Sequence, residues 1–140
     1  MSVEIKIVYN NFPHIRKAAQ PGTRAIVLKY SRLVHTDIIA QMQQPKHGRV
    51  YRSRKGVQKW HRASAPGQAP AIDTESYMRS IGNKWAGRYS RIVYTNDPRG
   101  PMFNRGTSKM FPRPHFAPAA RKYRRQFNSE MKRFLRRMNK

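Results

Sequence analysis

Cysteine, acidic side chains and large aliphatic residues are all scarce in this sequence of 140 residues. The absence of cysteine excludes a disulfide framework, a cysteine-ligated metal site and a thiol nucleophile. Only 6 Asp and Glu side chains oppose 30 Lys and Arg, so the formal net charge is +24 and the isoelectric point is near 11.6. A surplus of this size predicts a polyanionic or strongly acidic partner.

Large apolar residues are also few, because only 25 of the 140 residues are Leu, Ile, Val or Phe. Such a fraction, combined with high net charge, is typical of chains that bury little surface alone. The longest aliphatic run, Ala25–Leu28, is far shorter than the ~18 residues of a membrane-spanning helix. The first residues also lack the basic segment followed by an apolar segment that is typical of a secretory signal. We therefore expect one small domain over residues 1–140, not associated with a membrane, whose core is completed by a partner.

The spacing of apolar residues predicts a mixed fold. Alternation over residues 3–7 predicts a short strand with one buried face. Residues 23–42 have apolar positions every three or four residues, which predicts an amphipathic helix with Thr23 as its N-cap. The same periodicity after Pro118 predicts a second long helix, whose aromatic residues belong to the core. The fold class expected is α+β, a small and mostly antiparallel sheet packed by a long N-terminal and a long C-terminal helix.

A basic arm is expected over residues 45–72, inserted within the single domain, with short strands at 48–52 and 57–61. Tyr51 and Trp60 lie among its Lys and Arg residues, which suits phosphate contacts combined with stacking. Packing of both rings beneath their own hairpin is the alternative. The candidate contacts for nucleic acid or an acidic partner are Arg49, Arg52, Arg54, Lys55, Lys59 and Arg62 in the arm, and Arg121, Lys122, Arg124, Arg125, Arg136 and Arg137 on the second long helix.

Shorter elements are expected between the arm and the second long helix. Asp73 or Thr74 is expected to cap a short helix that extends to Ile81. A hairpin is expected around residues 85–94. Residues 97–118 are rich in Pro and Gly, which predicts a turn followed by irregular structure.

No pattern of residues indicates catalysis. The carboxylates are scattered, and helix capping explains the one close pair, Asp73 and Glu75. The five histidines lack metal-ligand spacing, and Gly106–Lys109 reverses the order of a phosphate-binding loop. We expect no enzyme activity and no catalytic, cofactor or metal site.

Several motifs occur in an order that is seen in one family of bacteriophage proteins. The motifs are Gly48–Tyr51, His61–Ala71, Asp73-Thr74 with Ser80-Ile81, Gly106–Met110 and Arg113–Ala119. On these residues, from about 48 to 127, the chain resembles the tail-completion, or head–tail joining (neck), proteins of long-tailed phages. The resemblance implies a structural virion protein, assembled in the host cytoplasm. Such proteins form a ring, often six-fold, between the head connector and the tail tube, and DNA leaves through its lumen.

A ring fits the small core, because contacts between subunits would bury more surface. The expected partners are further copies of the chain in a hexamer, other neck, connector or tail-tube proteins, and DNA in the lumen. Whether the basic surface faces DNA or acidic neighbours stays open. The irregular segments are the expected contacts between neighbours, at Ser64, Pro66, Gly67, Pro70, Gly106, Thr107, Met110, Pro114 and Phe116.

Composition alone favours a second function, that of a ribosomal-type RNA-binding protein. A very basic chain with a small core is typical of proteins that fold around RNA. This alternative predicts salt-dependent RNA binding by the isolated chain and no ring.

Overall fold

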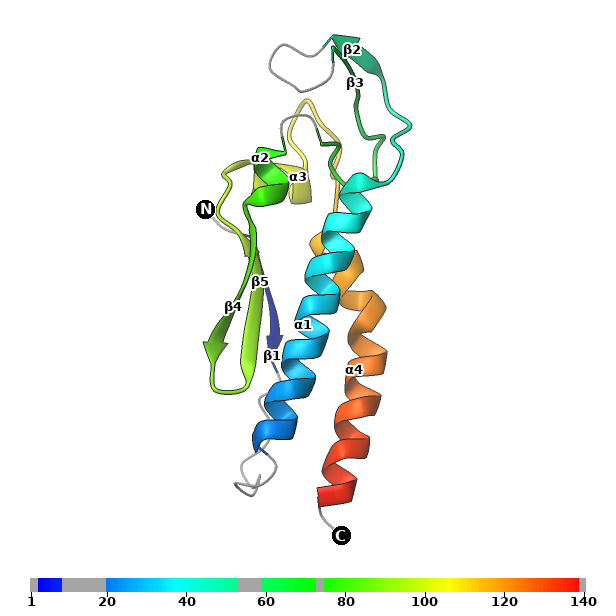
Figure 1. Cartoon of the computed structure of the whole chain (residues 1–140). Helices are drawn as coiled ribbons and strands as arrows, with labels where there is room; N and C mark the ends of the chain where they lie inside the picture. Colours follow the sequence, from blue (N-terminus) through cyan, green and yellow to red (C-terminus); the bar gives the residue numbers. More distant parts are fainter. Residues whose placement is uncertain (1–2, 9–19, 53–58, 73–74, 139–140) are drawn as a thin grey trace.

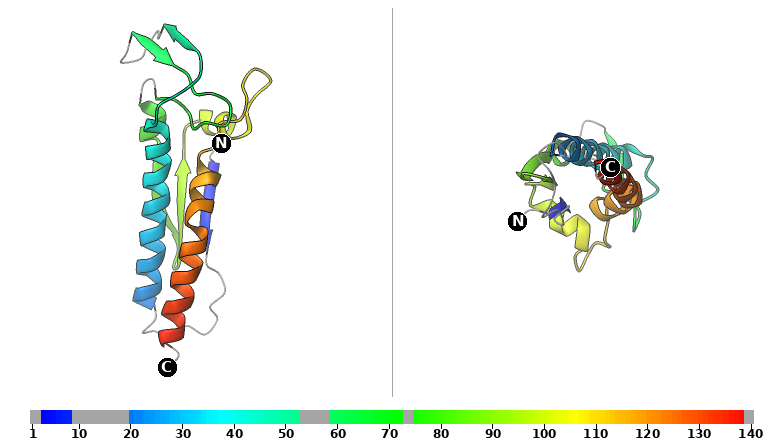
Figure 2. Two further views of the ribbon diagram at one scale, coloured as in Figure 1. Left: turned by 90° about the vertical axis from the view of Figure 1, so that its right-hand side faces the viewer. Right: turned by 90° about the horizontal axis from the view of Figure 1, so that it is seen from below.

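Two long helices lie antiparallel along the length of the molecule in the computed structural model, which describes residues 3–8, 20–52, 59–72 and 75–138 (Figure 1). They are α1 (Gln20–Gln43) and α4 (Phe116–Met138). Both agree with the apolar periodicity of the sequence, which confirms the predicted pair of long helices and the α+β class. Together they form one layer, and a small sheet forms the other (Figure 2).

The main sheet has three antiparallel strands in the order β1 (Val3–Val8), β5 (Ser90–Thr95) and β4 (Ile81–Gly87). The expected hairpin is the β4–β5 pair, and its register shifts between Trp85 and Gly87. The N-terminal strand is also confirmed, and it pairs with β5 over its full length. Because β5 is central, it places the N-terminal strand beside a hairpin that lies some 80 residues further along the chain.

The core consists of two clusters along α1. In the half nearer the C-terminal end of α1, residues Val34, Ile38 and Met42 pack with Tyr77, Ile81, Val93, Phe116 and Ala119. In the other half, Ile26, Val27 and Tyr30 pack with Phe127 and Met131 of α4. Tyr30 and Phe127 meet edge to face, with ring centroids 5.4 Å apart. The apolar stripes of both helices therefore face each other and the sheet, as their spacing predicts.

The basic arm projects beyond the C-terminal end of α1 (Figure 1). Its strands β2 (Val50–Arg52) and β3 (Trp60–Arg62) form a separate two-stranded sheet. This confirms a hairpin within residues 45–72, although the predicted turn at 53–56 lies outside the described residues. At the base of the arm, a Cβ on Gly48 would lie 2.5 Å from the carbonyl oxygen of Ala63, so the close approach of the two chain segments requires glycine.

One predicted helix cap and the predicted end of a second helix are wrong. Helix α1 begins at Gln20, so Thr23 lies within it and is fully buried. The helix starts earlier because Pro21 fits a first turn, where its missing N–H costs nothing. Helix α2 (Ser76–Arg79) ends before Ile81, which begins β4. Its preceding residue, Glu75, has φ 60° and makes no side-chain capping bond, and Asp73 and Thr74 lie outside the described residues.

The stretch after β5 is more regular than its composition predicts. Helix α3 (Arg99–Arg105) occupies much of the segment expected to be a turn and irregular chain. The carboxylate of Asp97 accepts a hydrogen bond from the backbone N–H of Arg99 at 2.9 Å, which favours a helix start there. Helix α4 also begins two residues before Pro118, at Phe116.

Candidate interface for a polyanionic partner

The acidic side chains that the structure describes are already used within the chain. Asp97 and Arg99 lie 2.6 Å apart, and Glu75 and Arg79 lie 2.8 Å apart. Glu130 pairs with Lys29 at 2.8 Å and accepts a hydrogen bond from Tyr30 at 2.7 Å. Asp37 pairs with Lys122. Since 30 basic side chains face only 6 acidic ones in the sequence, most of the positive charge has no carboxylate to neutralise it.

The arm surface, which we define as Arg49–Arg52 with Lys59–Trp60 and Arg62, combines exposed apolar side chains with basic ones. Trp60 is 59% exposed, Tyr51 47% and Val50 44%. Tyr51 contacts the buried His61 edge to face, with ring centroids 5.2 Å apart. The alternative in which both rings pack beneath the hairpin is therefore wrong for Trp60. The predicted contacts Arg54 and Lys55 lie outside the described residues.

A second basic surface runs along α4. Arg121, Arg125, Lys132 and Arg136 are spaced four, seven and four residues apart, which places them on one face of the helix. All are exposed, and the stripe is about 22 Å long at 1.5 Å per residue. Arg124 and Arg137 are exposed beside it.

Lys122 differs from the other predicted contacts on α4, because its ammonium group binds Asp37 of α1. This hydrogen bond, together with the negative charge of Asp37, raises the pKa of Lys122. Lys122 therefore ties α4 to α1 and is not a free contact for a partner.

The structure does not bring the predicted basic residues together into one site. The arm lies at the end of the molecule opposite the C-terminal end of α4, which carries Arg136 and Arg137 (Figure 1). Arg121, Arg124 and Arg125 belong to the half of α4 that is nearer the arm. Only an extended partner, or two separate partners, could contact both surfaces at once.

Three of the predicted neighbour contacts are buried inside the chain. Ser64 is 3% exposed, Pro70 is fully buried and Phe116 is 1% exposed. The loop that holds Ser64 and Pro70 folds against the base of the arm and the end of α1, and Phe116 begins α4 within the core. Of the other predicted contacts, Pro66, Gly67 and Thr107 are exposed, and Gly106, Met110 and Pro114 are partly exposed.

Sequence reasoning missed Phe111, which at 73% is the most exposed of the large apolar residues that the structure describes. It follows a tight loop that is closed by an antiparallel β-bridge between Thr107 and Met110. The loop begins at Gly106, whose φ is 78°. A phenylalanine next to a proline in a segment rich in Pro and Gly is the signal that could have identified it.

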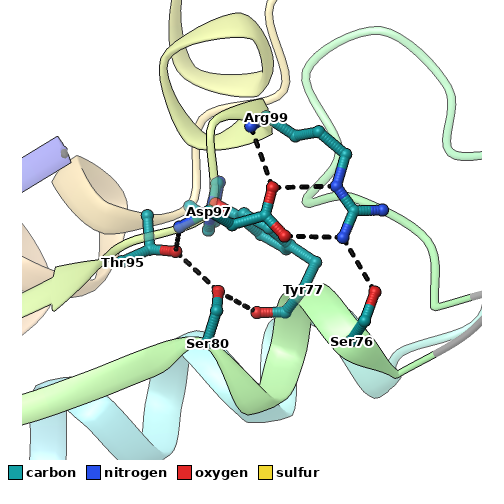
Figure 3. Close-up of polar contacts among 7 residues, drawn as sticks. Ser76, Tyr77, Ser80, Thr95, Asp97 and Arg99 are labelled. Carbon is teal, nitrogen blue, oxygen red and sulfur yellow. Dashed lines mark hydrogen bonds and ion pairs between the residues drawn. The ribbon is translucent and has the colours of Figure 1, made fainter. Parts of the chain in front are cut away.

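A polar cluster fixes the elements that lie below the arm (Figure 3). Both oxygens of Asp97 bind the Arg99 guanidinium, at 2.9 and 2.6 Å, and the same guanidinium donates to the Ser76 hydroxyl at 2.8 Å. The Ser80 and Thr95 hydroxyls lie 2.6 Å apart. The Arg99 hydrogen bonds hold the pKa of Asp97 below its usual value. The cluster joins α2, the end of β5 and the start of α3.

A pocket lies between the arm and the body. It is lined by Tyr51 and His61 from the arm and by Tyr77, Phe103 and Arg113, among others, from the body. The Nε atom of Arg113 is buried without a hydrogen-bond partner. The pocket therefore has aromatic walls, and the guanidinium of one of its lining residues is incompletely hydrogen-bonded.

Within the described parts of the chain, no helix combines the length and apolar character that a membrane crossing requires. The same parts hold no group of three or more histidine or acidic side chains that could bind a metal ion. No protein-family model, curated protein or solved structure matches the chain.

Proposed function

We propose that the chain is a structural virion protein of a long-tailed bacteriophage, a ring-forming neck or tail-completion component that joins the tail tube to the head connector. The ordered motifs of residues 48–127 support this function. The observation that carries the proposal is the projecting arm, whose Trp60 side chain is more than half exposed. The protein acts by packing and charge complementarity, without catalysis.

The arm has the properties of a contact between subunits. A two-stranded hairpin is marginally stable alone, and this one lies beyond the two core clusters. Exposed aromatic side chains with apolar neighbours are typical of interfaces, and tryptophan is enriched among the residues that contribute most to binding. Burial of Val50, Tyr51 and Trp60 against another copy would remove these side chains from water.

The basic stripe on α4 provides a second contact, for an acidic neighbouring protein of the neck or tail or for DNA in the lumen. Arg125 and Arg136 have no carboxylate partner among the described residues. Arginine binds carboxylate and phosphate groups in bidentate geometry, so both kinds of partner remain compatible with this surface.

Oligomeric state is the test of the ring. Negative-stain imaging and mass photometry of the full chain should show a closed ring of six copies. The double variant Tyr51→Ser/Trp60→Ser should lose the ring and stay folded as a monomer, because neither side chain contributes to the two core clusters. The matched control is Met102→Ser, which removes a 47% exposed apolar side chain outside the arm. A chain that stays monomeric, alone and with tail-tube or connector proteins, would contradict the proposal.

The α4 surface is tested separately. The double variant Arg124→Glu/Arg125→Glu reverses two exposed charges without touching the core. It should prevent assembly of infectious particles, and normal assembly would show that this surface makes no essential contact.

One observation favours the RNA-binding alternative. Tyr51 and Trp60 are exposed and are next in sequence to Arg52 and Lys59, an arrangement that also suits stacking of unpaired bases. This function predicts tight RNA binding by the monomer, with an affinity that falls steeply as salt rises. Titration of the chain with single-stranded RNA at two salt concentrations, combined with its oligomeric state, distinguishes the two functions, since the RNA-binding function predicts a monomer that binds RNA and forms no ring.

A further inference from the structure

The pocket between the arm and the body is walled by aromatic rings. Tyr51 and His61 are opposite each other in the strand register of the arm, so both side chains lie on one face of the hairpin, and both line the pocket. On the body, Tyr77 and Phe103 meet edge to face, with ring centroids 4.9 Å apart. Ala71 lines the same space. The arm and the body therefore form the pocket jointly, and its walls suit an aromatic group.

The size of the pocket fits a single ring. Its cavity volume is about 200 Å³. An apolar protein cavity of about 150 Å³ holds a benzene molecule, whereas sites for small-molecule ligands commonly measure about 300–1,000 Å³. The pocket therefore has room for one side chain of a partner and for little more.

Arg113 supplies a positive charge at this pocket. Its backbone N–H donates to the Phe103 carbonyl at 2.6 Å, and its own carbonyl lies 2.9 Å from Nδ1 of His115, so the main chain is held beside the aromatic wall. Among the described residues, none forms a hydrogen bond or an ion pair with the Arg113 guanidinium. Its Nε is buried without a partner, whereas its two terminal nitrogens are not buried. These terminal nitrogens are therefore accessible to a ligand.

The other charged side chains described around the pocket are already paired within the chain. The guanidinium of Arg99 binds both oxygens of Asp97 (Figure 3). Glu75 forms an ion pair with Arg79 at 2.8 Å. Arg113 thus leaves one positive charge for a partner to neutralise, and a carboxylate does so through paired hydrogen bonds.

The charge of the chain decides which kind of partner fits. A second copy would bring the same surplus of basic side chains, and every carboxylate whose surroundings are described forms an ion pair within its own chain. A nucleotide would need partners for the polar edge of its base, but the Tyr77 hydroxyl already binds His115. A protein segment with an aromatic side chain among acidic residues offers a ring for the cavity and a carboxylate for Arg113.

We propose that the pocket between Tyr51 and Phe103 binds one aromatic side chain from an acidic segment of a partner protein, with Arg113 bound to a carboxylate of that segment. An aromatic side chain that fills a pocket is a typical anchor of a protein interface. The bound segment contacts the arm and the body at once, and so fixes the arm relative to the body. The inference does not rest on the virion function, because it requires neither a ring nor the Trp60 side chain.

The test uses the full chain and two capped pentapeptides of equal charge. One has a phenylalanine with two aspartates on each side, and the other has an alanine in place of the phenylalanine. Calorimetric titration at fixed ionic strength should show at least about tenfold tighter binding of the phenylalanine peptide, because burial of this side chain accounts for such a difference. Arg113→Gln should weaken this binding roughly tenfold, since a charge-assisted contact is lost. Arg137→Gln, which removes an exposed charge on α4, is the matched control and should keep the affinity within about twofold.

A variant that fills the pocket tests the location of the site. Ala71→Leu adds a branched apolar group to the lining, so it should bind both peptides with the affinity that the wild type has for the alanine peptide. Ala71 is half-buried and the Arg113 guanidinium has no described partner, so both variants should stay folded, which thermal unfolding checks.

Four outcomes would overturn the proposal. One is equal affinity of the wild type for the two peptides. Another is an equal loss of affinity in Arg113→Gln and Arg137→Gln, which would show a general effect of net charge. Dissociation of an oligomer by the phenylalanine peptide, measured by mass photometry, would assign the pocket to a second copy. Displacement of this peptide by single-stranded oligothymidylate, with weaker oligothymidylate binding in Ala71→Leu, would assign the pocket to a nucleic acid.

Discussion

Lowering the pH from 7 to 5 should destabilise the fold chiefly through one side chain, His115. This histidine is fully buried at the start of α4. One ring nitrogen, Nδ1, lies 2.9 Å from the carbonyl oxygen of Arg113, which can only accept, so Nδ1 carries the proton. The other nitrogen, Nε2, then accepts from the Tyr77 hydroxyl at 2.6 Å. A second proton on His115 would make Nε2 a donor, so the Tyr77 hydroxyl would lose the bond that it donates, and it would place a charge in a buried site.

The size of the effect follows from the pKa of His115. Burial lowers this pKa, the hydrogen bond to the Arg113 carbonyl raises it in part and the positive charge of Lys46 lowers it, which together bring it from 6.5 to about 4. The unfolded chain therefore takes up the proton first, so stability falls as the pH drops from about 6.5 towards 4. At pH 5 the difference amounts to about 2 kcal/mol, at 1.36 kcal/mol for each pKa unit. The pKa values of Asp97 and Glu130 are lowered by their basic partners, so both stay ionised in the folded chain at this pH.

Urea unfolding at pH 7 and pH 5, at fixed ionic strength, measures this loss in the wild type and in His115→Gln. The variant is less stable at both pH values, but it should lose about 2 kcal/mol less than the wild type between them. NMR titration of the His115 ring protons gives the pKa directly. An equal loss of stability in both proteins, or a ring that titrates near 6.5, would refute the reasoning.

Three substitutions test other parts of the fold. Asp97→Asn should cost about 1–3 kcal/mol in urea unfolding, because Arg99 loses two charge-assisted bonds, whereas Glu75→Gln breaks an exposed pair and should cost less than about 0.5 kcal/mol. Gly48→Ala should separate the segments at the base of the arm, seen as faster cleavage of the arm by protease without a comparable fall in melting temperature. Met131→Ala should cost about 2–5 kcal/mol because it leaves a cavity between the helices, and Met102→Ala, at a 47% exposed position, should cost less than about 0.5 kcal/mol.

The elements with strong apolar periodicity could be predicted from the sequence. Helices α1 and α4 and the β4–β5 hairpin follow directly from spacing, because their buried faces repeat over many residues. Helix α3 could not be predicted, since a seven-residue helix whose one buried residue is Gly100 gives no apolar periodicity, and Gly100 and Pro101 argue against a helix locally. The pairing of β1 with β5 is a contact between distant segments, which no local pattern specifies.

Candidate contact residues could be predicted from the sequence where the structure leaves their side chains exposed. Arginines on the outer face of α4 and the aromatic residues of the arm are exposed, as a basic binding surface requires. The buried position of Arg91 could not be predicted in this way, because a charged side chain is expected at the surface and its burial depends on tertiary packing. Phe116 and Pro70 were misplaced for the opposite reason, since a segment rich in Pro and Gly gives no sign of which residue turns into the core.

The distribution of charge limits how copies of the chain can associate. Every carboxylate whose surroundings are described forms an internal ion pair, so two subunits approach each other with like charges on the arm and on α4. Association through the apolar side chains of the arm must overcome this repulsion, and it should become stronger as added salt screens the charges. Binding to DNA or RNA releases counterions and should become weaker as salt is added. The two contacts proposed for the basic surfaces therefore have opposite salt dependence, and one salt series on the wild-type chain separates contact with a neighbouring copy from contact with a polyanion.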